Sequence, residues 1–409
     1  MKKLTLFLLL LFLFHIDVYG AASDRIETKT AEDETGEEID TKVNTDTEES
    51  GVYTEEDVNE VTEGLLSGLD LSEIDNIVEE MLGTDELSFS ELVWKLTTGE
   101  LELDAELLLD MLQEIFFEEL LEQKEILMQL FLLVLVSALL FNLTHLFENG
   151  QMTNVTFYMV YLMVFVLLMK SFRGLLGQVE SVVGSTTSFM KILTPSYFLA
   201  ITASNGSLTA SAYYQVVLIT ITLVQSLLLK IGIPGIQMYV VLGIVNYLSQ
   251  EDFLSKMAEL IKTVVIWMTK TVTALVVGLQ VIQKMIAPAV DMVKRGFIGK
   301  TASAIPGLGN VLDSVTEMTI GCAVLVRNCM GVAALVVLVV FGLGPIVQLG
   351  VTALLYRLVA AVVQPVSEKR LIQAITVMAE GCGMLLRILV TAEILFLLTI
   401  AIVASGGIE

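Results

Sequence analysis

The chain has 409 residues, 55% of them hydrophobic, and its mean hydropathy is +0.75. Ordinary soluble domains do not have this composition, which indicates a membrane protein. The net charge of −24 is unevenly placed: residues 21–125 carry 34 acidic and 5 basic side chains, whereas residues 126–409 carry 12 acidic and 16 basic ones. Such an acidic first segment argues against nucleic acid as a partner, because it would repel the phosphates.

The first 22 residues predict a secretory signal peptide. Two lysines precede the apolar run "LTLFLLLLFLF", and the small residues Gly20, Ala21 and Ala22 follow it. An uncleaved anchor helix is the alternative, although the run is short for a membrane span. Residues 23–51 are rich in Glu, Asp and Thr and have almost no large apolar side chain, so we expect an acidic disordered tether there.

Residues 52–125 predict a small extracytoplasmic segment of amphipathic helices. Leu, Ile, Val and Phe recur at spacings of three and four residues, which favours three or four helices. Ser72 precedes acidic residues, as does Ser88 or Ser90, and each pattern is typical of a helix start. Two interpretations remain open for this segment: a helical subdomain with a solvated acidic face, or a docking surface for an extracytoplasmic partner.

Residues 126–409 form the expected membrane domain, because about 20 apolar residues cross the hydrocarbon layer as a helix. The predicted fold class is all-α: a polytopic membrane protein with about six to eight transmembrane helices. The candidate spans are 126–147, 154–170, 208–229, 231–248, 257–285, 330–363 (one span or two, split at Pro345) and 377–404. Two further segments, 172–193 and 305–327, are amphipathic, and the first is expected to lie along the membrane interface.

Polar side chains within or beside these apolar runs are candidate functional residues, because they are costly in lipid. Each either lines a polar passage or pairs with a neighbour and serves packing. The candidates are Lys270, Asn310, Asp313, Glu317, Arg327, Asn328, Glu380 and Arg387. The positions expected to make structural turns are Pro195, Pro306, Gly309, Pro345 and Pro365.

The stretch "IPGLGNVLDSVTEM", residues 305–318, predicts a helix that is entered through a Pro-Gly turn. Helical spacing places Asn310, Asp313 and Glu317 on one face of that helix. Carboxylates cannot face hydrocarbon, so this face must contact water at the interface, a protein neighbour or a polar cavity.

Catalytic and metal-binding patterns are missing from the sequence. Its three cysteines, Cys322, Cys329 and Cys382, all lie in the membrane half, and His145 is the one histidine beyond the signal peptide. There is no P-loop, no dinucleotide-binding fingerprint and no zinc-ligand spacing. We therefore expect neither an enzyme nor a cofactor.

The predicted localisation is the cell membrane, with residues 23–125 outside the cytoplasm. The basic cluster of Lys284, Lys294, Arg295 and Lys300 then falls inside, as the positive-inside rule requires. The basic residues of 170–191 fall outside, which fits that rule poorly.

The block "KTASAIPGLGNVLDSVTEMTIGCAVLVRNCMGVAALVVL" resembles the most characteristic part of the stage III sporulation protein AE family. The matching positions are Ile305, Pro306, Gly309, Asp313, Leu325, Val326, Arg327, Asn328 and Gly331. A second resemblance lies further on, at Pro345, Tyr356, Arg357, Leu358, Ala360, Ala361, Gln364 and Pro365. The chain departs from the family pattern at residues 366–369, "VSEK", where the family has a Gly-rich turn.

The resemblance implies a role in endospore formation. It implies a subunit, in the mother-cell membrane around the forespore, of a channel or secretion-like complex that supports late forespore gene expression. The implied partners are the other proteins of the stage III sporulation complex and a protein of the forespore membrane, and a homo-oligomer is also open. Two alternatives are a self-contained secondary transporter for a small solute and a membrane scaffold that anchors extracytoplasmic partners.

Overall fold

The computed structural model describes residues 55–83, 88–99, 150–205, 207–249, 251–298, 309–365 and 367–405, with isolated positions between 117 and 139. All of them belong to one compact unit, Val52–Glu409. Within these ranges every regular element is a helix and none is a strand, which confirms the expected all-α fold class. The expected signal peptide and acidic tether, and most of the expected span 126–147, lie outside the described residues.

Three short helices open the described part of the chain: α2 (Glu55–Ser67), α3 (Ser72–Leu82) and α4 (Phe89–Thr97). At the start of α3, the amide and hydroxyl of Ser72 donate to the carboxylate of Asp70, and these bonds lower the pKa of Asp70. The carboxylate of Asp75 accepts hydrogen bonds from the hydroxyls of Ser88 at 2.9 Å and Ser90 at 2.8 Å. Asp75 thereby ties α3 to the start of α4, and the helix starts expected at Ser72 and Ser88 are confirmed.

The remaining helices are long. They are α7 (Gly150–Asn205), α8 (Ser207–Leu227), the π-helical turn η1 (Leu228–Gly232), α9 (Ile233–Leu248), α10 (Ser255–Ile298), α11 (Gly309–Val363) and α12 (Lys369–Ser405). At a rise of about 1.5 Å per residue, the 56 residues of α7 extend for roughly 84 Å. The hydrocarbon layer is only about 30 Å thick, so α7 and α11 reach well beyond it or cross it obliquely.

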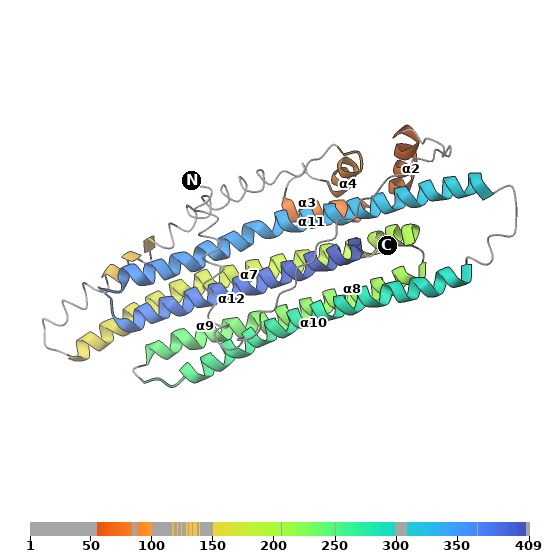
Figure 1. Cartoon of the computed structure of the whole chain (residues 1–409). Coiled ribbons are helices and arrows are strands. Elements are labelled where there is room, and N and C mark those ends of the chain that lie inside the picture. The colour runs from red at the N-terminus through yellow and green to blue at the C-terminus, as the bar shows by residue number, and fades with distance from the viewer. Residues whose placement is uncertain are drawn as a thin grey trace, which may run out of the picture. The chain divides into compact units, whose positions relative to one another are not determined.

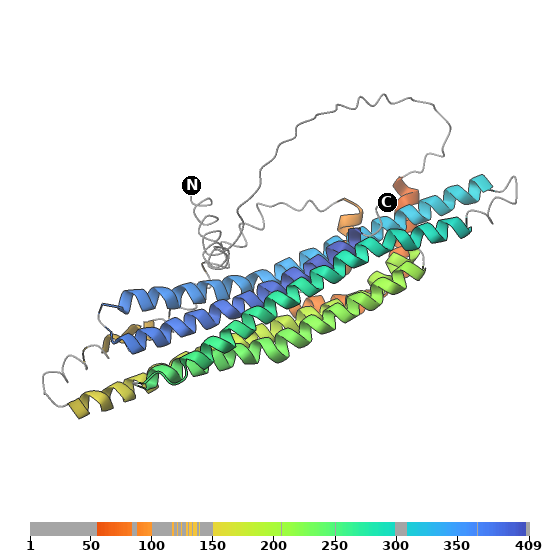
Figure 2. The same cartoon turned by 60° about the horizontal axis from the view of Figure 1, so that its bottom comes forward.

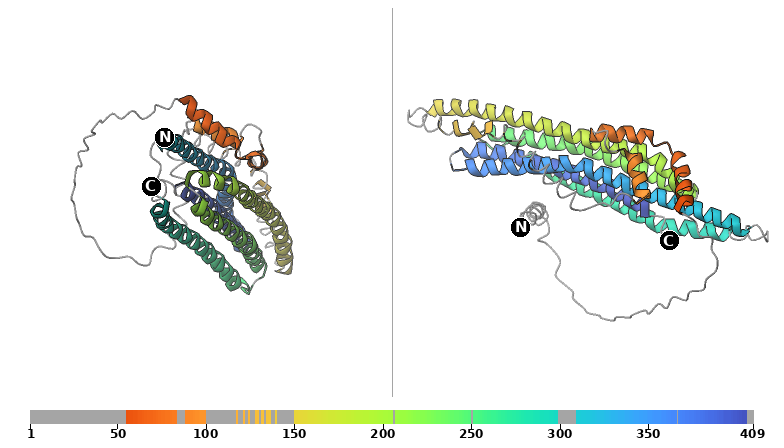
Figure 3. Two further views of the ribbon diagram at one scale, coloured as in Figure 1. Left: turned by 90° about the vertical axis from the view of Figure 1, so that its right-hand side faces the viewer. Right: turned by 90° about the horizontal axis from the view of Figure 1, so that it is seen from above.

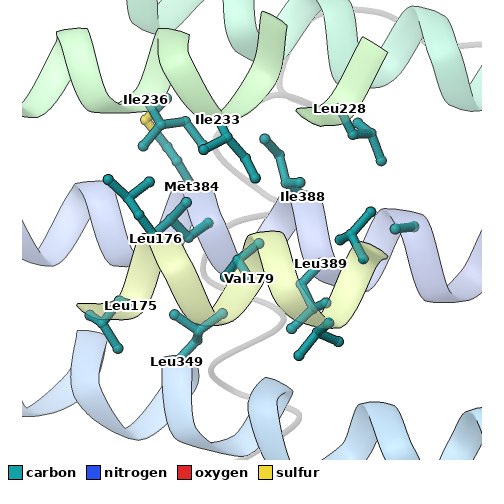
Figure 4. Packing of buried hydrophobic residues seen from close by; sticks show 14 of the residues in the cluster. Leu175, Leu176, Val179, Leu228, Ile233, Ile236, Leu349, Met384, Ile388 and Leu389 are labelled. Atoms are coloured by element: carbon teal, nitrogen blue, oxygen red, sulfur yellow. The ribbon is translucent and has the colours of Figure 1, made fainter. Parts of the chain in front are cut away.

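These helices lie alongside one another as a bundle (Figures 1 and 2). α11 and α12 form an antiparallel pair, α7 packs against both, and α9 and α10 cover the opposite side of α12. Apolar side chains of α7, α9, α11 and α12 fill the space between the ribbons (Figure 4). Leu349 of α11, Val179 of α7 and Leu389 of α12 are fully buried in this core.

Small residues allow the closest approaches between the helices. A Cβ atom on Gly381 of α12 would collide with Cγ2 of Val240 in α9. A Cβ atom on Gly235 of α9 would lie 2.6 Å from Cγ2 of Val265 in α10. Glycine at these positions lets α9 lie directly against both α10 and α12, as small residues do in membrane bundles.

The helices α3 and α4 pack on the same bundle, against α7 and α11 (Figure 3). Ile74 and Val78 of α3 and Phe89 of α4 are fully buried. The ring of Phe89 meets that of Phe189 in α7 edge-on, with centroids 6.2 Å apart. The amphipathic helices predicted between residues 52 and 99 therefore direct their apolar faces onto the long helices.

The structure differs from the sequence expectations at several breaks. Pro195 lies inside α7 and Pro345 inside α11, so neither makes a turn and the expected run 330–363 is not split. Residues 172–193 are part of the continuous helix α7 and not a separate interfacial helix. A proline inside a helix removes one backbone hydrogen bond. In a membrane bundle, contacts with neighbouring helices compensate for this loss, so the helix continues. The expected turn at Pro365 lies between α11 and α12, and Gly309 begins α11.

The expected spans 208–229 and 231–248 also join. The π-helical turn η1 links α8 to α9, so helical structure is continuous through residues 207–248. A π turn accommodates the extra residue before Pro234 without ending the helix. Among the described residues, five helices are long and apolar enough to cross a membrane, within Val155–Thr202, Gln215–Leu248, Ser255–Leu279, Met318–Val363 and Lys369–Ala401.

Large apolar side chains are exposed along two of these helices. They are Val155, Met159, Leu162, Met163 and Val166 on α7, and Met257, Leu260, Val264 and Trp267 on α10. Spacings of three and four residues place each set on one side of its helix. In water such faces would promote association, whereas lipid tails would cover them, so their exposure is typical of a membrane protein.

Candidate functional site

A line of polar side chains runs along the packed interface of α7 with α11 and α12, which we call the polar seam. At one end, Tyr356 of α11 donates to the hydroxyl of Ser171 in α7 at 2.8 Å. About two helical turns along α7, the side-chain amide of Gln178 donates to that of Gln348 in α11. These pairs step along the antiparallel helices in register, because residue numbers rise on α7 as they fall on α11.

Glu393 of α12 lies further along the polar seam. Its carboxyl is 4% exposed, and its Oε1 accepts a hydrogen bond from the hydroxyl of Thr186 in α7 at 3.1 Å. Its Oε2 has no hydrogen-bond partner among the residues that the structure describes. A Cβ atom on Gly342 of α11 would lie 3.0 Å from Cδ of Glu393. The absence of a side chain at Gly342 therefore makes room for the carboxyl where the three helices meet.

Arg327 of α11 lies beyond Glu393 along the polar seam and is completely buried. Its Nη2 donates to Oδ1 of the adjacent Asn328 at 3.1 Å. Close by, a Cβ atom on Gly331 would lie 2.8 Å from the hydroxyl oxygen of Tyr197 in α7. Because Arg327 is completely buried, its guanidinium does not reach out of the packed helices, as a side chain that snorkels to the membrane interface would.

A second polar group, which we call the Glu380 network, lies on the other side of α12. Lys262 of α10 donates to Oε2 of Glu380 at 2.7 Å, and the hydroxyl of Tyr239 in α9 donates to the same oxygen. The ammonium of Lys262 also lies 5.8 Å from the centroid of the Tyr239 ring. Both charged side chains are 36% exposed. The network thus joins α9, α10 and α12 around one compensated carboxylate.

The sequence candidates fall into three groups in the structure. Arg327 and Asn328 lie in the polar seam, and Glu380 forms its own network. Lys270 is exposed on α10, and Arg387 is half-buried on α12. The backbone of residues 310–317 is helical in α11, but the side chains of Asn310, Asp313 and Glu317 lie outside the described side chains, and Pro306 lies outside the described residues.

Sequence reasoning missed most of the polar seam. Thr186, Gln178 and Gln348 carry no charge, and such side chains are common in helices, so only their pairing distinguishes them. Glu393 had a visible signal, since a carboxyl in an apolar run is costly. In the part of the chain that the structure describes, no group of three or more His, Cys, Asp or Glu side chains could hold a metal ion.

The fold and these sites define a class: an all-α, multispan membrane protein with polar groups packed between its helices. Residues 87–407 match the family described as stage III sporulation protein AE, and the chain belongs to this family. It is also 23% identical, over 294 residues, to the stage III sporulation protein AE of Bacillus subtilis (strain 168), an alignment that covers 71% of this chain and 73% of that protein. No solved structure matches the chain. The family resemblance seen in the sequence is thereby confirmed.

Proposed function

We propose that this protein is a membrane subunit of a channel or secretion-like complex that connects the mother cell with the forespore and supports late forespore gene expression. The family match, which extends over all of the long helices, is the observation that carries the proposal. In this proposal the protein lies in the mother-cell membrane around the forespore, with residues 23–125 on the extracytoplasmic side. Its partners are the other proteins of the stage III sporulation complex and a protein of the forespore membrane.

The helices α2, α3 and α4 are the proposed contact with extracytoplasmic partners. Their apolar faces are used against the long helices, which leaves polar faces outward. Exposed acidic side chains on those outward faces include Glu63, Glu73, Glu80 and Glu91. A segment that is fixed to the bundle in this way holds a partner at a defined orientation, which a flexible tether cannot do.

Deletion of the gene tests the proposal. We expect vegetative growth to be normal and sporulation to stop after engulfment of the forespore, with wild-type spore yield restored by the intact gene. Tagged full-length protein from sporulating cells should also co-purify, after crosslinking, with other sporulation membrane proteins. Normal spore yield from the deletion strain would contradict the proposal.

A self-contained secondary transporter for a small solute is the second candidate, and the buried carboxyl of Glu393 is the observation that favours it, since ionisable groups in membrane helices often lie on transport pathways. Purified protein reconstituted alone into liposomes separates the two candidates. Solute flux without any partner protein supports the transporter, whereas flux that requires partner proteins supports the channel subunit.

A further inference from the structure

The surroundings of Glu393 offer its carboxyl very little that would stabilise a negative charge. One hydroxyl, that of Thr186, donates to it, and no ion pair with it occurs among the described residues. Leu389 and Phe396, which lie about one helical turn to either side of Glu393 on α12, are fully buried in the apolar core. An ionised carboxylate that is removed from water and left without a cation costs several kcal/mol or more, whereas a protonated carboxyl costs far less.

Among the side chains that the structure describes, no charged group on the helices packed against α12 pairs with Glu393. The charged side chains of α7 (Lys170, Arg173, Glu180 and Lys191), Lys230 of η1 and Lys256, Glu259 and Lys270 of α10 are exposed. Lys262 of α10 is bonded to Glu380, and residues 207–227 and 233–248 carry no charged side chain. On α11, Arg327 and Arg357 each lie 15 residues from Gly342, about four helical turns away. Arg387, six residues before Glu393 on α12, lies about 9 Å away along the helix axis and about 120° around it. Among the described side chains, Glu393 therefore has no counter-ion.

We propose that Glu393 is a proton-binding site, and that the protein closes the polar seam when the carboxyl is protonated and opens it when the carboxyl is ionised. In the closed state Glu393 is neutral and lies against Gly342 and Thr186. Loss of the proton to water creates a charge that the closed interface cannot solvate. Water or a cation must then enter between α7, α11 and α12, and this entry separates the helices.

The Glu380 network provides a matched control on the same helix. Glu380 lies 13 residues before Glu393 on α12, but it receives hydrogen bonds from Lys262 and Tyr239 and is 36% exposed. An ammonium partner compensates its charge, so Glu380 stays ionised in the same conditions. Glu380 and Glu393 have the same side chain, so a measurement that finds one ionised and the other protonated reports on the surroundings of each carboxyl.

Infrared spectroscopy of the full-length protein in lipid nanodiscs tests the protonation state. At neutral pH the wild type should show a carbonyl band of a protonated carboxyl that is lost in E393Q and retained in E380Q. Removal of the hydroxyl donor in T186V should shift this band, and E393D should shift it without abolishing it, so the assignment does not depend on one variant folding. The absence of such a band in the wild type, or its persistence in E393Q, overturns the proposal.

Amide hydrogen exchange tests the opening. After correction for the intrinsic pH dependence of exchange, the wild-type segments 179–190 and 386–397 should lose protection at the pH at which the infrared band disappears. The same segments in E393Q should keep their protection throughout, because the amide cannot ionise. If these segments of the wild type are equally protected above and below that pH, protonation of Glu393 is not coupled to opening of the polar seam. Neither result depends on a sporulation phenotype, so the inference stands or fails independently of the proposed complex.

Discussion

The two carboxyls of α12 show how one residue type takes two roles within a single helix. Glu380 lies between α9 and α10, where Lys262 and Tyr239 both donate to it and part of the side chain is exposed. Glu393 lies between α7 and α11, where a single threonine hydroxyl donates to it and almost no surface is exposed. The first is a compensated charge at the edge of the bundle. The second is a polar group that the bundle can hold without strain only while it is neutral.

The largest expected effect comes from placing a fixed cation at the buried position. Glu393→Lys would bury an ammonium for which the described residues offer no acidic partner, at a cost on the order of 3–5 kcal/mol. We expect the variant to lose most of its monodisperse fraction after detergent extraction and to unfold at a lower temperature. Glu393→Gln, which keeps the shape and cannot ionise, is the control and should remain folded. A Glu393→Lys protein as stable as the wild type would show that the site is open to water.

A smaller but more specific effect comes from filling the space opposite Glu393. Gly342→Ala places a methyl group 3.0 Å from Cδ of Glu393, so the carboxyl or α11 must shift, at a cost of about 1–3 kcal/mol. Gly344→Ala is the matched control, because nothing lies within 4 Å of a Cβ atom at that position, and its thermal unfolding should change little.

The double variant of Gly342→Ala with Glu393→Asp sharpens the same comparison. The shorter aspartate side chain withdraws from the added methyl group, so the two changes together should cost less than the sum of the single changes. A double-mutant cycle on thermal unfolding measures this coupling. Strict additivity would indicate that Gly342 and Glu393 do not contact each other in the folded protein.

The Glu380 network, unlike the buried site of Glu393, should tolerate changes of charge with only a small loss of stability. Glu380→Gln removes half of a partly exposed ion pair, so we expect a loss of about 1 kcal/mol or less. The reversed pair, Lys262→Glu with Glu380→Lys, should recover part of the stability that either single change removes. No recovery in the reversed pair would show that Tyr239, and not Lys262, is the main partner of Glu380.

The helices themselves were predictable because their signals are local. The apolar runs of about 20 residues, and the serines at the starts of α3 and α4, are signals carried by consecutive residues. The ends of the helices were less predictable. Pro195 and Pro345 were expected to make turns, but packing against neighbouring helices keeps α7 and α11 continuous. Whether a proline ends a helix depends on contacts that no local window contains.

The candidate site residues were likewise only partly predictable from the sequence. The cost of charge in an apolar run correctly drew attention to Arg327 and Glu380, both of which are held by other groups in the structure. The same argument selected Lys270, which the structure exposes on α10. Pairings across long separations, such as Thr186 with Glu393, carry no local signal, because nothing near Thr186 in the chain distinguishes it from other threonines.

A further small effect distinguishes the hydroxyl pair at one end of the polar seam from the carboxyl of Glu393. Tyr356→Phe removes the 2.8 Å hydrogen bond to Ser171 and leaves the buried ring in place, so we expect a loss of about 0.5–1.5 kcal/mol with no dependence on pH. Ser171→Ala in the same background should then cost little more, since its partner is already gone. Thermal unfolding at two pH values checks both statements. A pH-dependent effect of Tyr356→Phe would mean that the hydroxyl pair is linked to Glu393, and the polar seam would then act as one connected network along α7.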